Sequence, residues 1–164
     1  MKKLLNTLLT DHSLRSWVVF LGCVLLLGTG YFLQYRVGLI PCPLCILQRF
    51  FFALVGITAL AIAIRKPSAQ ELTLLSYAML ACSFFGGALA ARQIWLQHNP
   101  PSLLGASCVP GLASITNLIA SIFKATADCA EKGWTLLSLS IPEWSLIAFV
   151  VLAVISTIPL WKKD

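Results

Sequence analysis

The stretch SWVVFLGCVLLLGTGYFLQY, residues 16–35, carries no charged side chain and lies between Arg15 and Arg36. A helix needs roughly 20 apolar residues to cross the hydrocarbon core of a bilayer, which is about 30 Å thick. Fifteen residues precede this stretch, and no Ala-x-Ala cleavage site follows it. We therefore expect a membrane-spanning helix that stays in the mature protein rather than a cleaved signal peptide.

Three further stretches have the same character, namely residues 43–64, 72–91 and 144–161. The last two contain no charged residue, and the first holds a single one, Arg49. The apolar runs are continuous and do not alternate with polar residues, which favours helices over a membrane barrel. The sequence thus predicts an all-α membrane protein, a four-transmembrane-helix bundle that forms a single membrane domain over residues 1–164.

The composition agrees with this fold class. Of the 164 residues, 59% are hydrophobic and 11% are charged, and the mean hydropathy is +0.87. Soluble domains carry about 25% charged residues, so a typical soluble enzyme and a disordered chain are both excluded. The net charge is +6, but the twelve basic residues are too few and too scattered to follow a phosphate backbone. We expect no nucleic-acid partner.

The basic residues predict the orientation, because four spans place both termini on the same side. The terminal side has Lys2, Lys3, Arg15, Arg65, Lys66, Lys162 and Lys163, and the other side has Arg36, Arg92, Lys124 and Lys132. Short cytoplasmic segments are rich in lysine and arginine. The termini are therefore expected in the cytoplasm, and residues 36–42 and 92–143 are expected to form the outer loops.

The long outer loop contains several helix breakers, including Asn99-Pro100-Pro101 and Pro110-Gly111. A run of apolar residues at helical spacing follows them: Leu112, Ile115, Leu118, Ile119, Ile122 and Phe123. This pattern predicts a short amphipathic helix. Such a helix could lie on the membrane surface, or it could simply pack on the outer ends of the spanning helices.

The predicted topology divides the six cysteines into two groups. Cys23 and Cys82 lie in the middle of spans, where a cysteine behaves as a small apolar residue. The other four are Cys42, Cys45, Cys108 and Cys129, and all fall on the outer side or at its boundary. Disulfides persist on that side if the membrane is a bacterial inner membrane.

Cys42-Pro43-Leu44-Cys45 is a Cys-x-x-Cys pair at the start of the second predicted span. This spacing permits a redox-active disulfide, although it also occurs in structural and zinc-binding sites. Pro43 suits the first position of a helix. Cys45 then lies in the first turn, where unpaired N–H groups and the helix dipole favour an anion. That setting stabilises a thiolate, the reactive form of cysteine.

Arg49 follows Cys45 by four residues and is expected on the same face of the helix. A guanidinium group within a membrane helix is costly and usually functional. It could stabilise a thiolate or polarise a carbonyl oxygen, or it could extend along the helix so that its charge reaches water. Gln48 offers a further hydrogen-bond donor on a neighbouring face.

Cys108 and Cys129 are separated by 20 residues of the outer loop. A structural disulfide there would contribute about 3 kcal/mol in the chain-entropy model. A four-cysteine zinc site would normally show a second Cys-x-x-Cys pair, which this chain lacks. The breaker-rich surroundings of Cys108 also suit an exposed disulfide that a thiolate of another protein can attack.

The chain resembles the DsbB family, which comprises bacterial inner-membrane thiol–quinone oxidoreductases. The resemblance rests on four spans, on Pro-Cys-Pro-Leu-Cys followed by Ile-Leu-Gln-Arg, and on a long outer loop with two more cysteines. It extends over further segments, namely ARQIWLQ at 91–97, SCVPG at 107–111, DCAE at 128–131 and IPEWS at 141–145.

This resemblance implies an electron relay that sustains disulfide bond formation. Reduced DsbA, a periplasmic protein with a thioredoxin fold, would attack a Cys108–Cys129 disulfide, and Cys108 would form the mixed disulfide. The electrons would then pass to a Cys42–Cys45 disulfide, and Cys45 would deliver them to a quinone of the membrane pool. The acceptor would be ubiquinone or menaquinone, which diffuses in the membrane, and no metal is expected.

The family also has an arginine that contacts the quinone, and Arg49 matches it. Gln48, Arg92 and Gln93 are further candidate contacts. Some members carry a histidine near the quinone where this chain has Gln93, and His98 is expected to be an ordinary loop residue.

Two other functions remain as alternatives. The first is an enzyme similar to vitamin K epoxide reductase, but in that family the quinone-proximal pair lies toward the end of the chain. The second is a non-catalytic membrane protein with structural disulfides.

Overall fold

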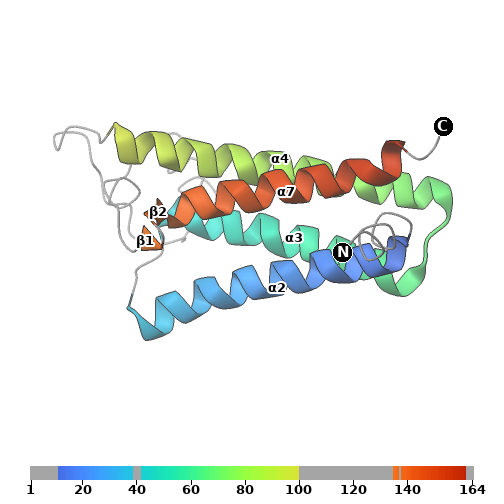
Figure 1. Ribbon diagram of the computed structural model, residues 1–164, viewed down its shortest axis with the longest axis horizontal. Coiled ribbons are helices and arrows are strands. Elements are labelled where there is room, and N and C mark those ends of the chain that lie inside the picture. Colours follow the sequence, from blue (N-terminus) through green and yellow to red (C-terminus); the bar gives the residue numbers. More distant parts are fainter. Residues whose placement is uncertain (1–10, 39–41, 100–134, 137, 162–164) are drawn as a thin grey trace.

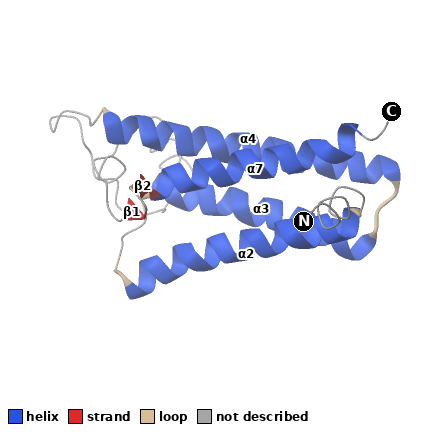
Figure 2. Cartoon of the chain, in the orientation of Figure 1, coloured by secondary structure: helices blue, strands red, loops and turns tan. Residues whose placement is uncertain are grey.

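The computed structural model describes residues 11–38, 42–99, 135–136 and 138–161. Within these ranges four helices run antiparallel to their neighbours along the chain (Figure 1). They are α2 (His12–Arg36), α3 (Pro43–Arg65), α4 (Ala69–His98) and α7 (Ile141–Trp161). Helix α2 packs on α3, α3 packs on α4, and α4 packs on α7. Two short antiparallel strands, β1 (Thr135–Leu136) and β2 (Leu139–Ser140), precede α7 (Figure 2).

All four helices are long and apolar enough to cross a membrane, as the sequence predicts. Large apolar side chains cover their outer faces; Leu25 and Phe84, for example, are 71% and 70% exposed. Exposed apolar area of this extent is suited to lipid rather than to water. The start of α2 and the end of α7 lie at one end of the bundle, and the starts of α3 and α7 lie at the other (Figure 1).

Local sequence signals explain where the helices begin. Helix α3 begins at Pro43, as predicted, with Cys42 in the extended N-cap conformation. Helix α4 begins after a capping box, in which the Ser68 hydroxyl accepts from the Glu71 N–H and the Glu71 carboxylate accepts from the Ser68 N–H. The turn between α3 and α4 is tight because Lys66 adopts the left-handed conformation with φ 46°.

The third span is longer than the sequence predicted. Residues 92–98, which were expected in the outer loop, continue α4 for almost two further turns. His98 is therefore the last residue of a helix rather than a loop residue, and its ring Nδ1 lies 2.9 Å from the Ile94 carbonyl oxygen. The predicted amphipathic helix, at 112–123, lies outside the described residues.

The apolar core lies between all four helices at mid-height. Phe52 of α3 stacks on Phe149 of α7, with ring centroids 4.0 Å apart and planes 8° from parallel. Cys23 is 1% exposed within this core, and Cys82 packs against it. Both cysteines behave as small apolar residues, as expected from their positions in the spans.

Candidate functional site

The Cys-x-x-Cys pair forms the first turn of α3. The Cys42 Sγ accepts the backbone N–H of Cys45 at 3.4 Å, so the sulfur itself serves as the helix cap. The two sulfur atoms are 3.1 Å apart. A disulfide between them therefore requires only a small approach of the sulfurs, and reducing it requires no rearrangement of the helix.

Two glutamine side chains lie against this pair, Gln48 from α3 and Gln93 from α4. The Gln93 Nε2 donates to the Cys45 Sγ at 3.2 Å and to the Cys42 Sγ at 3.4 Å. The Gln93 Oε1 accepts from the Gln48 Nε2 at 2.8 Å, and the Cys45 thiol lies 3.6 Å from the same oxygen. The extension of α4 beyond the predicted span is what carries Gln93 to the cysteines.

The surroundings of the pair are largely buried. Cys42 is 5% exposed and clusters with the fully buried Leu44 and with Leu96, which is 2% exposed. Gln48 and Gln93 are 3% and 4% exposed. Cys45 is the more accessible of the two sulfur-bearing residues, because it is only half-buried. An acceptor molecule approaching from outside would therefore meet Cys45 before Cys42.

Arg49 lies one turn after Cys45 in α3, as helical spacing predicts, and its side chain extends to the neighbouring helix α2. Its guanidinium group points to α2, where Nη1 donates to the Gln34 Oε1 and Nη2 donates to the Gly30 carbonyl oxygen at 3.0 Å. The guanidinium carbon lies 5.1 Å from the ring centroid of Tyr31, a cation–π distance. Arg49 makes no hydrogen bond to the Cys45 sulfur within the described residues, so direct stabilisation of a thiolate by Arg49 is not part of this arrangement.

Glycine at position 30 leaves room for the Arg49 side chain beside α2. A Cβ atom built on Gly30 would lie 3.2 Å from the Arg49 Nε, a tighter approach than most side chains make. The contacts of Arg49 with Gln34, Gly30 and Tyr31 were missed by the sequence analysis. Gln34 was the available signal, since it is a polar residue near the C-terminal end of a largely apolar span.

Three predicted site residues remain, namely Arg92, Cys108 and Cys129. Arg92 precedes Gln93 in α4 and is half-buried. Cys108 and Cys129 lie outside the described residues, so their position relative to Cys42 and Cys45 stays a prediction.

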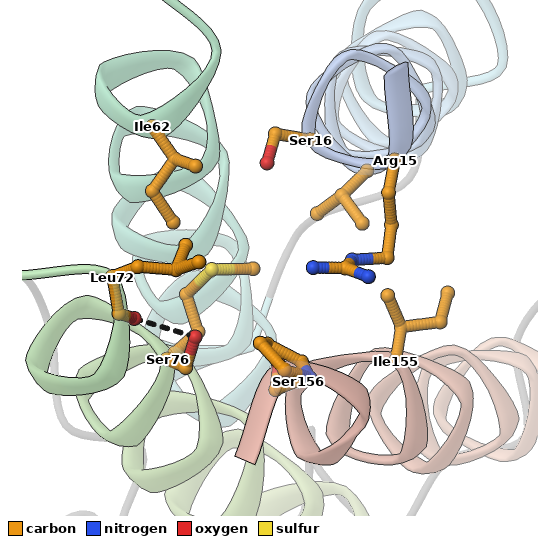
Figure 3. Close-up of a pocket in the computed structure, with 10 residues that line it drawn as sticks. Arg15, Ser16, Ile62, Leu72, Ser76, Ile155 and Ser156 are labelled. Atoms are coloured by element: carbon orange, nitrogen blue, oxygen red, sulfur yellow. Dashed lines mark hydrogen bonds between the residues drawn. The ribbon is translucent and has the colours of Figure 1, made fainter. Parts of the chain in front are cut away.

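A second polar cluster lies at the opposite end of the bundle (Figure 3). Arg15 of α2 is 7% exposed, and its Nη2 lies 3.0 Å from the His12 Nδ1. Its guanidinium lines a cavity of about 20 Å³ together with the three serines Ser16, Ser76 and Ser156. That volume holds about one water molecule. It is far too small for a quinone head group, so this cavity is not a candidate quinone site.

Four membrane helices with a closely spaced cysteine pair at one end define the class: a multi-pass membrane protein with a redox-capable Cys-x-x-Cys pair. Comparisons with known proteins identify the family. The model of the family described as "Disulfide bond formation protein DsbB" matches residues 13–158 of this chain. The chain belongs to this family. It is thus a disulfide bond formation protein, an oxidoreductase that acts on disulfides.

Individual relatives agree with the family assignment. "Disulfide bond formation protein B 1" of Pseudomonas aeruginosa is 45% identical over 139 residues, covering 81% of this chain and 85% of the relative. "Disulfide bond formation protein B" of Azoarcus sp. is 38% identical, with 84% and 86% covered. The protein of the same description from Aromatoleum aromaticum is 34% identical, with 93% and 97% covered. No solved structure matches the chain.

Proposed function

We propose that this protein is a thiol–quinone oxidoreductase of a bacterial inner membrane. It reoxidises a periplasmic thioredoxin-fold protein of the DsbA type and passes the electrons to the membrane quinone pool. Its termini face the cytoplasm, and its four outer cysteines face the periplasm. The excess of lysine and arginine on the terminal side supports this orientation.

The observation that carries the proposal is the placement of the thiol pair at a helix start. The sulfurs of Cys42 and Cys45 are 3.1 Å apart at the end of a membrane helix, and Cys45 is half-buried. A lipid-soluble acceptor can reach such a site from the membrane, whereas a soluble protein reaches it only with difficulty. A second, outer pair is therefore needed to receive electrons from a soluble partner, and Cys108 and Cys129 are the candidates.

The relay consists of two exchanges and one oxidation. A thiolate of the partner attacks a Cys108–Cys129 disulfide, and the second partner thiol then releases the partner as a disulfide. The outer dithiol reduces the Cys42–Cys45 disulfide in the same way. Finally, the Cys42–Cys45 dithiol loses two electrons and two protons to the quinone, which leaves as quinol. The diffusible quinone, either ubiquinone or menaquinone, is thus the terminal oxidant.

Arg49 is the proposed quinone contact. Arg49 follows Cys45 by one turn of α3, and its guanidinium is held by Gln34 and Gly30 of α2. A fixed cation at this end of the bundle supports a contact with a quinone carbonyl oxygen. Gln48, Arg92 and Gln93 are further candidate contacts on the same side. Of these, Gln48 and Gln93 are already engaged with each other, and Gln93 also bonds both sulfurs.

The experiment that tests this function uses the purified chain in detergent with ubiquinone-1 and a reduced DsbA-type protein under anaerobic conditions. We expect one quinol to form for each partner disulfide formed. Ultraviolet absorbance measures the quinol, and thiol titration measures the disulfide. Quinone left unreduced while the cysteines are oxidised would favour a non-catalytic membrane protein with structural disulfides. Reduction of quinone that leaves the partner dithiol intact would also contradict the proposal.

Displacing the Arg49 side chain should weaken quinone binding and leave disulfide formation by the cysteines unchanged. We expect Gly30→Ala and Arg49→Ala each to raise the KM for quinone about tenfold, since one hydrogen bond to a charged group contributes roughly 1.5–3 kcal/mol. The added methyl group of Gly30→Ala would crowd the Arg49 Nε at 3.2 Å. Gly28→Ala is the matched control, because a Cβ there meets nothing within 4 Å. An unchanged KM in both variants, measured by steady-state kinetics, would remove Arg49 from the quinone site.

A further inference from the structure

We propose that Gln93 acts on sulfur rather than on quinone: its amide N–H groups stabilise the Cys45 thiolate, and Gln48 is the positioning residue that aims them. This inference rests on the thiol–quinone function proposed above and assigns a role within it. It also changes the expectation that both glutamines contact the quinone directly.

The arrangement of donors and acceptors around the Gln93 amide supports this role. A glutamine amide has one acceptor oxygen and two N–H donors. The Gln93 oxygen takes the Gln48 N–H at 2.8 Å, the shortest polar contact of the cluster, and this turns the Gln93 nitrogen toward the sulfurs. Both sulfurs then receive an N–H from the same atom, at 3.2 and 3.4 Å. Gln48 itself makes no hydrogen bond to either sulfur among the described residues.

Burial makes these contacts effective. Both glutamines are at least 96% buried, and leucines enclose the neighbouring Cys42. In a medium of low dielectric constant, an N–H donated to an anion is stronger than the same bond in water, and an anion without donors is costly. The Arg49 guanidinium is held on α2, whereas the Gln93 amide donates directly to the Cys45 sulfur.

A thiolate that is stabilised in this way has two consequences for the relay. First, a larger fraction of Cys45 is in the form that reacts with an acceptor. Second, stabilising the reduced form of a dithiol makes its disulfide a stronger oxidant. The Cys42–Cys45 disulfide must oxidise the outer pair, so the second effect favours electron flow toward the quinone.

Alkylation in the absence of quinone tests the contact directly. In a Cys42→Ser background, Gln93→Met and Gln48→Met are each expected to slow the reaction of Cys45 with iodoacetamide about tenfold at neutral pH. Methionine preserves the length of the side chain and removes its N–H donors. Unchanged alkylation in Gln93→Met would overturn the proposal.

Gln97 provides the matched control. It lies one turn beyond Gln93 on α4, is 8% exposed, and donates to neither sulfur within the described part of the chain. Gln97→Met should therefore leave Cys45 alkylation unchanged. An equal slowing in Gln97→Met would mean that any polar loss on this helix disturbs the site, and the specific role of Gln93 would be wrong.

Steady-state kinetics separates the two roles of Gln93. If Gln93 acts on sulfur, Gln93→Met lowers kcat for quinone reduction about tenfold and leaves the KM for quinone unchanged. A raised KM with normal alkylation would instead identify Gln93 as a quinone contact and overturn the inference. Because alkylation needs no quinone, it also distinguishes failure of this inference from failure of the proposed quinone function, which the wild-type assay detects.

Discussion

Cys45→Ser is expected to lower quinone-dependent oxidation of the partner dithiol by about a thousandfold or more, as is usual when a reacting nucleophile is removed. A serine hydroxyl forms no disulfide and transfers no electron pair. The outer pair would then have no acceptor. Electrons would accumulate on the partner and on Cys108 and Cys129, and the partner would remain reduced in the anaerobic assay described above.

Cys42→Ser should be equally inactive while preserving the fold. A serine hydroxyl is a better N-cap acceptor than a thiol for the Cys45 N–H, which the Cys42 sulfur accepts in this structure. Cys82→Ala is the control: Cys82 packs against the apolar core in mid-span, away from the site, and its loss should leave turnover intact. Full turnover in either Cys42→Ser or Cys45→Ser would rule out the relay.

The C-terminal end of α4 shows what hydropathy cannot predict. The sequence predicted a span that ended at residue 91, because the charged Arg92 interrupts the apolar run. Hydropathy measures how well a side chain dissolves in lipid, not whether it is buried against other helices. Gln93 is polar, yet it is only 4% exposed. Its burial is possible because its amide forms hydrogen bonds with two sulfurs and with Gln48. The polar residues that were assigned to a loop are thus part of the helix that completes the site.

The position of Arg49 shows a similar limit. Spacing along one helix placed it on the face of Cys45, and the direction of its long side chain was left undetermined. The acceptors that decide the direction, Gln34 and the Gly30 carbonyl oxygen, belong to another helix. By contrast, the start of α3 at Pro43 was predictable, because the proline and the cap are determined by adjacent residues.

The packing of α4 on α7 depends on a glycine that no sequence pattern distinguished. A Cβ on Gly86 would lie 2.3 Å from the Phe149 Cζ and 2.4 Å from its Cε1, which is far inside van der Waals contact. The Phe149 ring is 1% exposed and stacked on Phe52, so it cannot turn away without losing that stack. Gly86 therefore allows the close approach of these two helices.

We expect Gly86→Ala to lower the free energy of unfolding by about 1–3 kcal/mol, which is the usual cost of overpacking a core. Gly22→Ala, on α2, is the matched control, because a Cβ there meets nothing within 4 Å. Because alanine has a higher helix propensity than glycine and meets no steric clash at this position, Gly22→Ala should raise the free energy of unfolding by up to about 1 kcal/mol. The two glycine substitutions are thus expected to have opposite signs in denaturant titrations in mixed micelles.

A double-mutant cycle assigns the loss to the ring. Phe149→Leu removes the atoms that the added methyl group would meet, and on its own it destabilises the core by leaving space beside Phe52. In the Phe149→Leu background, Gly86→Ala should cost much less than in the wild type, because contacting residues do not have additive effects. Equal costs in the two backgrounds would show that the methyl group acts elsewhere than on Phe149.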